Sequence, residues 1–179
     1  GSDIYRYPRI HYRWDTQTGD GLVFGFGNGV EALGALFAQD LELRLGSRTV
    51  AVREAQMTFH EHSLELMPRL QRLHLRSPWL PLNQQNYQRY QQMNRGAKNR
   101  ELDRLAVANI LSALKGLDIN IEGRVYAAFF PRRRTSCRYK DQQLLGFLGT
   151  LVTNVSLPDG FAVGKAVSHG YGWLVEQED

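Results

Sequence analysis

The residues best suited to chemistry lie in a glycine-rich segment near the C-terminus, Gly160 to Gly172, with the sequence GFAVGKAVSHGYG. Glycine has no Cβ, so the backbone N–H groups beside it can approach a phosphate closely, and such turns form anion-binding concavities. We therefore predict a phosphate-binding loop whose ligands are Gly160, Gly164, Lys165, Ser168, Gly170 and Gly172. The spacing is not that of a nucleotide-binding P-loop. A glycine-rich hairpin or bulge with a purely structural role is the alternative.

A basic stretch precedes this segment. Residues 124–140 contain six basic side chains and no acidic one. With the two-residue period of a β-strand, one face would carry Arg132, Arg134, Ser136, Arg138 and Lys140. Such a row of cations repels itself unless an anion lies against it, and an RNA backbone would supply that anion. We expect a basic hairpin around Pro131 that binds RNA through Arg132, Arg134, Arg138 and Lys140, with a solvated surface hairpin as the alternative.

Histidine is the side chain that most often exchanges protons near neutral pH, and the chain has five. His169 is the one embedded in the glycine-rich segment, which makes it the candidate catalytic residue. His60 and His62 would share one face of a strand, but no third ligand of suitable spacing stands out, so we expect no metal site. The sequence also shows no dinucleotide fingerprint, and no cofactor is expected.

The elements that must position these residues alternate between strands and helices. The hydrophobic periodicity of the first half predicts strands over 5–14, 22–26 and 49–59 and a helix over 28–38. The second half predicts strands over 70–75, 124–130, 135–139, 144–152 and 171–175 and helices over 83–92 and 101–115. We therefore expect an α+β fold of two tandem ferredoxin-like domains, residues 1–66 and 67–179, the first lacking its opening β-α. Trp79, after a Ser-Pro pair, is expected to plug the core.

Composition narrows the class of protein. The 179 residues are 42% hydrophobic and 22% charged, with a net charge of +4 and a pI near 9.4, which is typical of a globular protein and compatible with a polyanionic partner. The single cysteine, Cys137, excludes an internal disulfide and favours the cytoplasm. No apolar run approaches the ~20 residues of a membrane helix, so no membrane partner is expected. The Gly1-Ser2 start is expected to be a cloning remnant on a segment excised from a longer chain.

Five segments together carry a family resemblance. In chain order they are YRYPRIHY (5–12), SPWLPLNQQNY (77–87), NILS (109–112), GFLGTLVTN (146–154) and GKAVSHGYG (164–172). They resemble the Cas6 family of CRISPR-associated endoribonucleases, of the RAMP superfamily, in its subtype b form. The resemblance covers nearly the whole chain and extends to the Cas6 domains that are fused to a reverse transcriptase and the Cas1 integrase.

The resemblance implies tandem ferredoxin-like domains and a glycine-rich loop that contacts RNA. It implies a nuclease of antiviral defence that cleaves the CRISPR precursor transcript within its repeats, without metal, through attack by a 2′-hydroxyl. The products would be a 2′,3′-cyclic phosphate and a 5′-hydroxyl. The implied partners are CRISPR repeat RNA and other CRISPR-associated proteins. A non-catalytic RNA-binding RAMP subunit of an effector complex is the alternative, and a purely structural protein-interaction module is a second one.

Two departures from the family pattern bear on activity. The family usually carries its catalytic histidine ahead of the Tyr-x-Tyr-Pro segment, and this chain begins after that stretch. His169 stands where the family often has arginine or lysine, and Ala162 stands where glycine is common. On this pattern we expect the RNA grip to be present and any local catalytic role to fall on His169.

Overall fold

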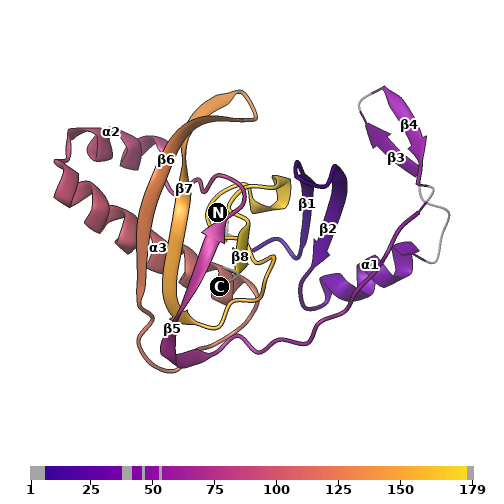
Figure 1. Cartoon of the computed structure of the whole chain (residues 1–179), viewed down its shortest axis with the longest axis horizontal. Helices are drawn as coiled ribbons and strands as arrows, with labels where there is room; N and C mark the ends of the chain where they lie inside the picture. Colours follow the sequence, from indigo (N-terminus) through magenta and orange to yellow (C-terminus); the bar gives the residue numbers. More distant parts are fainter. Residues whose placement is uncertain (1–6, 38–41, 46, 53, 177–179) are drawn as a thin grey trace, which may run out of the picture.

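A computed structural model describes residues 7–37, 42–45, 47–52 and 54–176. The N-terminal half forms an antiparallel hairpin of β1 (Ile10–Asp15) and β2 (Asp20–Gly25), helix α1 (Gly29–Phe37), and a second hairpin of β3 (Glu42–Leu45) and β4 (Arg48–Ala51). In Figure 1 the first hairpin lies beside the glycine-rich segment, whereas the second projects away from the rest of the molecule.

Two predicted strands of this half differ from the structure. The first begins at Ile10, after Pro8, and its opening residues 5 and 6 lie outside the described residues. The strand predicted over 49–59 is wrong beyond Ala51, because residues 54–59 form no strand and most of them are exposed. A strand needs a pairing partner and a face to bury, and this stretch has neither.

The C-terminal half is one antiparallel sheet of β5 (Leu66–Leu75), β6 (Ala127–Tyr139), β7 (Gln142–Val155) and β8 (Leu174–Glu176), in the order β6-β7-β5-β8. Helices α2 (Gln84–Gln92) and α3 (Arg95–Gly116) connect β5 to β6. The chain order therefore follows the β-α-β-β-α-β pattern of a ferredoxin-like unit, with the short 3₁₀ turn η1 (Val167–His169) in place of the second helix. The predicted α+β class is confirmed.

The hairpin predicted around Pro131 is wrong. Residues 127–139 form one continuous strand, β6, with a bulge between Pro131 and Arg133, and the chain reverses at Lys140 and Asp141. Proline cannot donate to a strand ladder, but β6 is an edge strand, where proline is tolerated and a bulge absorbs the mismatch. The predicted strands over 124–130 and 135–139 are therefore parts of a single element.

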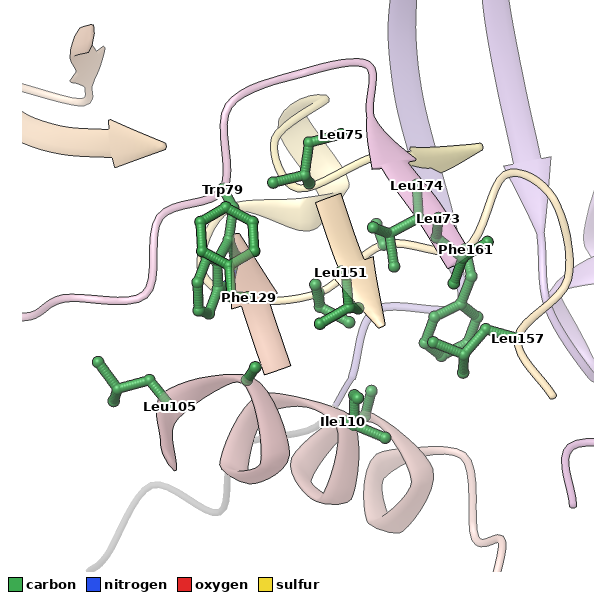
Figure 2. Close-up of a cluster of buried hydrophobic side chains, with 14 of the residues drawn as sticks. Leu73, Leu75, Trp79, Leu105, Ile110, Phe129, Leu151, Leu157, Phe161 and Leu174 are labelled. Atoms are coloured by element: carbon green, nitrogen blue, oxygen red, sulfur yellow. The ribbon is translucent and has the colours of Figure 1, made fainter. Parts of the chain in front are cut away.

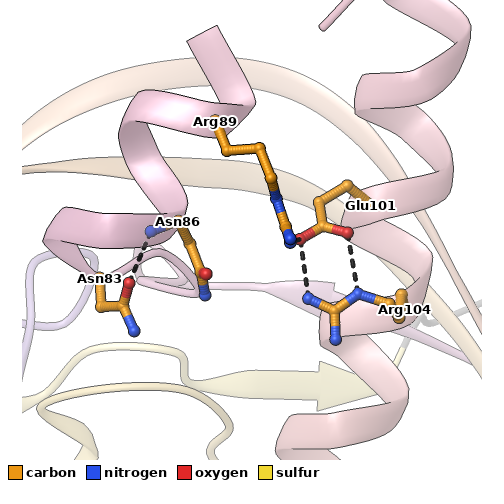
Figure 3. A network of polar contacts seen from close by, with 5 residues as sticks. All are labelled: Asn83, Asn86, Arg89, Glu101 and Arg104. Atoms are coloured by element: carbon orange, nitrogen blue, oxygen red, sulfur yellow. Dashed lines mark hydrogen bonds and ion pairs between the residues drawn. The ribbon is translucent and has the colours of Figure 1, made fainter. Parts of the chain in front are cut away.

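Asparagine caps start α2 and α3, and Figure 3 shows the cap of α2. Asn83 Oδ1 accepts a hydrogen bond from the Asn86 N–H at 2.7 Å, as predicted for α2. Helix α3 begins at Arg95 and not at Glu101, because Asn94 caps it through the Ala97 N–H. Glu101 is instead a buried carboxylate that accepts bonds from Arg104 and Arg89. These bonds, chiefly those from Arg104, lower the pKa of Glu101 to about 2.

The core lies between α3 and one face of the C-terminal sheet. Figure 2 shows Ile110 of α3 facing Leu151 and Phe129 of the strands. Trp79 is 1% exposed, packs against Phe129 at 4.8 Å between ring centroids, and donates its Nε1–H to Asn109 Oδ1 at 2.9 Å. The prediction that Trp79 plugs the core is confirmed. None of the described helices is both long and apolar enough to cross a membrane.

Candidate nucleic-acid interface

The glycine-rich segment is fixed on the chain that follows β5. The Lys165 N–H donates to Leu80 O at 3.1 Å, and the Gly172 N–H donates to Pro78 O at 2.9 Å. Gly164 has a φ of +93°, and a Cβ added there would lie 2.6 Å from Trp79 Cδ1. Only glycine fits this position without strain, because the backbone is left-handed and lies against the buried indole. The segment therefore has one fixed path across the protein.

Most glycines of this segment shape its path through bonds within the protein. The N–H groups of Gly160, Gly170 and Gly172 donate to Leu174 O, Val167 O and Pro78 O respectively. The turn between Gly164 and Gly170 is the part that projects: Lys165 and His169 are exposed and Ser168 is half-buried. The surface that can meet a ligand is therefore concentrated in residues 165–169, which we call the grip turn.

The backbone of the grip turn changes hand near its start, and its Lys165 and His169 N–H groups donate within the protein, to Leu80 O and Ala166 O. Ala166 adopts a left-handed conformation, with a φ of +57°, directly before the right-handed turn η1. Such an alternation points successive backbone N–H groups to one side. Ser168 Oγ lies 3.0 Å from His169 Nδ1, so these two side chains are held together. Desolvation by the surrounding protein lowers the pKa of the Lys165 ammonium below its ordinary value.

The grip turn meets the tip of the β6–β7 hairpin. The His169 ring stands edge-on to the Tyr139 ring, with 5.2 Å between centroids, and Tyr139 also contacts Tyr171 at 6.4 Å. The Tyr171 hydroxyl donates to Arg138 O at 2.9 Å, and Lys140 Nζ lies 5.6 Å from the Tyr139 ring centroid. The two basic features of the sequence are therefore joined in one place by aromatic side chains that the sequence analysis did not select.

The predicted row of cations on β6 needs a correction. The bulge removes Arg132 from the alternation, and Lys140 lies in the turn with a φ of +53°. Arg134, Ser136 and Arg138 do share one face, but Arg134 lies over the Tyr90 ring of α2 at 6.0 Å. The glycine-rich segment approaches the opposite face, which carries Cys137 and Tyr139. The exposed arginines therefore flank the grip turn and do not form one row beside it.

The β1–β2 hairpin supports the segment from the other side. A Cβ on Gly170 would meet Tyr12 O at 3.2 Å, and a Cβ on Gly160 would meet Phe24 Cε1 at 2.5 Å. Tyr7 precedes the hairpin, and its hydroxyl donates to Ala162 O at 2.7 Å. The N-terminal half therefore touches the glycine-rich segment along much of its length.

Charged and polar side chains of β1 are buried against this support. The Arg13 guanidinium lies 4.2 Å above the Phe24 ring and 5.0 Å from the Trp173 ring, and burial lowers its pKa to about 10. Asp15 accepts two bonds from Arg76, which lower the pKa of its carboxyl. His11 is fully buried, and desolvation lowers its pKa to about 4, so it is neutral at pH 7. None of these three residues was predicted from the sequence to have a role in the site.

The prediction that His60 and His62 share a strand face is wrong, because residues 54–65 form no strand. His62 Nε2 instead lies 2.9 Å from Ser156 Oγ and ties this connection to the end of β7. Within the described part of the chain, no three histidine, cysteine or acidic side chains come together as metal ligands.

Comparison with known families gives a consistent result across the whole chain. The Cas6b N-terminal domain matches residues 1–63, and the Cas6b C-terminal domain matches residues 65–177. An uncharacterized protein of Methanocaldococcus jannaschii is 32% identical over 103 residues, which cover 58% of this chain and 70% of that protein.

Solved structures share the fold. A crystal structure of Cas6b superposes with a TM-score of 0.88 at 24% identity, covering 97% of this chain and 79% of that one. A crystal structure of the CRISPR RNA processing endoribonuclease Cas6b gives 0.78 at 22% identity, with 97% and 83% covered. Csf5, a type IV Cas6 crRNA endonuclease, gives 0.53 at 10% identity, with 96% and 68% covered. The tandem ferredoxin-like architecture expected from the sequence agrees with the Cas6b structures.

Proposed function

Because the chain belongs to the family defined by the Cas6b N-terminal and C-terminal domains, we propose that it binds CRISPR repeat RNA and processes it as an endoribonuclease. The observation that carries this proposal is the meeting of the grip turn with the hairpin tip, where His169 and Ser168 lie against Tyr139. Lys165, Arg138 and Lys140 lie at this point, and Arg132 and Arg134 lie further along β6. Within the described residues none of these five cations forms an ion pair, so they are available to phosphates.

In the proposed reaction the 2′-oxygen of one nucleotide attacks the adjacent phosphorus, and the bond to the 5′-oxygen of the next nucleotide breaks. A base accepts the 2′-hydroxyl proton, an acid donates a proton to the leaving oxygen, and cations stabilise the charged intermediate. The products are a 2′,3′-cyclic phosphate and a 5′-hydroxyl. We assign the local proton-transfer role to His169, and Lys165, four residues earlier in the grip turn, is a cation that can stabilise the charged intermediate. This chemistry needs no metal ion and no cofactor.

The test is single-turnover cleavage of an end-labelled CRISPR repeat RNA, with the same RNA carrying a 2′-deoxy nucleotide at the scissile position as the control. The proposal expects a product with a 2′,3′-cyclic phosphate from the first RNA and none from the second, in the presence of EDTA. Cleavage that persists on the deoxy RNA would contradict attack by the 2′-hydroxyl.

A non-catalytic RNA-binding subunit is the second candidate function, because the exposed cations around the grip turn would bind RNA whether or not it is cleaved. It predicts salt-sensitive binding of the repeat RNA without cleavage, since phosphate contacts release counterions. A protein-interaction module predicts neither. Fluorescence anisotropy at several salt concentrations, run beside the cleavage assay, separates the three functions.

A further inference from the structure

The two faces of the C-terminal sheet differ in what covers them. Phe129, Leu151 and Leu73 point into the core toward α3, so their neighbours in the strands point the opposite way. One row on this opposite face is Phe130, Thr150 and His74, which pair across β6, β7 and β5. We call this surface the outer face of the sheet.

The outer face combines exposed apolar groups with cations. Phe130 is 59% exposed and Leu70 is 62% exposed, and Arg72 and Arg133 are exposed on the same side. Among the residues that β5, β6, β7 and β8 present on this face, none is acidic. Aromatic side chains that alternate with cations suit single-stranded RNA, because bases stack on the rings while phosphates meet the charges. The absence of acidic groups favours a polyanionic partner, and the exposed aromatic rings favour one that carries bases.

A hollow of about 490 Å³ opens at the edge of this surface, where β5 and β6 begin and where Arg104 and Val107 of α3 also line it. Its walls include Leu70, Tyr126 and Val152, and its arginines are Arg104 and Arg124. The Arg124 guanidinium lies 5.2 Å from the centroid of the Tyr126 ring, which is 53% exposed. Arg104 is bonded to Glu101, so Arg124 is the guanidinium of this hollow that can meet a phosphate, beside the Tyr126 ring on which a base can stack.

The outer face continues the grip along one strand. Beyond the bulge, Arg133, Thr135, Cys137 and Tyr139 alternate onto the outer side of β6, and Tyr139 is the residue that contacts His169. Tyr139 and Phe130 are nine positions apart on β6, or roughly 30 Å at the rise of a strand. RNA that leaves the grip turn in this direction would therefore run over Arg133 to Phe130.

We infer that the outer face is a base-stacking platform for single-stranded RNA, with Phe130 and Tyr126 as the stacking residues and Arg72 and Arg133 as the phosphate contacts. This inference rests on the proposed function, because it extends the RNA path from the grip turn. It adds a second binding surface, distant from His169, that sets the length of single strand the protein holds.

The experiment measures binding of fluorescein-labelled oligouridylates by anisotropy, one of about 4 and one of about 12 nucleotides, a range that spans known single-strand site sizes. The Phe130→Ala variant should raise the Kd of the longer RNA at least about fivefold and leave the shorter RNA unchanged, since stacking on one ring is worth ~1–3 kcal/mol. Phe130→Tyr should restore binding. Phe59→Ala is the matched control, because Phe59 is 66% exposed and lies outside the strands of the sheet.

Phe130→Ala and Tyr126→Ala could bind the longer RNA as the unmodified chain does, while Lys165→Gln loses binding. The grip turn would then bind RNA but the outer face would not, and the platform would be wrong. The outer face would then be a surface for a protein partner. If the unmodified chain binds neither oligouridylate, the platform is wrong. If it also shows no salt-dependent binding of CRISPR repeat RNA, the proposed function fails with it. If Phe130→Tyr does not rescue, Phe130 acts through folding and the stacking role is overturned.

Discussion

The glycine-rich segment has two sides that use polar groups in opposite ways. On its inner side, against β1 and β2, Arg13, Asp15 and His11 are buried and contact other protein groups. On its outer side, at the grip turn, Lys165 and His169 are exposed and their charges or protons are available to a ligand. The inner side therefore holds the segment in the fold, and the outer side is the one that can bind RNA. A change on the inner side should alter stability, and a change on the outer side should alter the handling of RNA.

This separation also explains why glycine occupies several positions of the segment. At Gly160, Gly164 and Gly170 the missing Cβ makes room for Phe24, Trp79 and the β1 backbone, respectively. These glycines are therefore needed for packing, and the residues between them are the ones we propose to contact RNA.

The largest effect is expected from the outer side. We predict that His169→Ala lowers the rate of RNA cleavage about a thousandfold, because a side chain that transfers a proton contributes ~10²- to 10⁴-fold. Binding of the uncleaved deoxy RNA and the urea midpoint of unfolding should change little. The control is His62→Ala, since His62 bonds Ser156 away from the grip turn. If both variants lose the same fraction of the cleavage rate, His169 has no special role in the reaction.

The inner side should respond with a loss of stability. We predict that Gly164→Val destabilises the fold by about 3 kcal/mol, because a β-branched side chain at positive φ is strained and would overlap Trp79. Urea unfolding measures this change. Gly34→Ala is the matched control: nothing lies near its Cβ position in α1, so alanine should be neutral or stabilising. A Gly164→Val chain as stable as the control would show that the segment has room to move.

The inner side should also make stability depend on pH through His11. Its pKa of about 4 in the folded chain lies below the ordinary 6.5, so unfolding takes up a proton between these values. Stability is therefore full above about pH 6.5 and falls as the pH approaches 4, by about 2 kcal/mol between pH 7 and pH 5. His11→Gln should flatten this part of the profile in urea titrations. An unchanged slope in the variant would place the proton uptake elsewhere.

The smallest effect should come from the flanking arginines. We predict that the triple change Arg132→Ala, Arg134→Ala and Arg138→Ala weakens RNA binding by less than about tenfold near physiological salt. The slope of the logarithm of the binding constant against the logarithm of salt concentration should become shallower by about 2, because each lost phosphate contact to a single strand removes ~0.7. Anisotropy at several salt concentrations measures both quantities. Unfolding should be unaffected because the three side chains are exposed. An unchanged salt slope would remove these arginines from the RNA path.

The sequence predicted the elements that follow one strong local signal. Asn83 before a polar helix, the apolar spacing of α3 and the alternation of β5 each gave an element of the right type. The N-terminal end of α3 was missed, because residues 95–100 carry almost no apolar residues and their helix depends on the Asn94 cap.

The site could not be predicted in full, because it is built from contacts between distant parts of the chain that local sequence patterns do not contain. In β1 the aromatic residues Tyr12 and Trp14 are exposed while His11, Arg13 and Asp15 are buried, the reverse of what hydrophobicity favours. The buried set is explained by partners far along the chain, such as Arg76 and Trp173. The bulge after Pro131 likewise shifts the alternation of β6, and it was invisible in the spacing of the arginines.

The central claim is that the grip turn and the hairpin tip hold the RNA, and ultraviolet cross-linking of a labelled CRISPR repeat RNA to the intact chain tests it most directly. Mass spectrometry of the digested complex should find RNA attached to peptides that contain His169, Tyr139 or Tyr171, and Lys165→Gln should weaken those cross-links. Cross-links confined to the hairpins of the N-terminal half, with none on residues 138–140 or 165–171, would contradict the account.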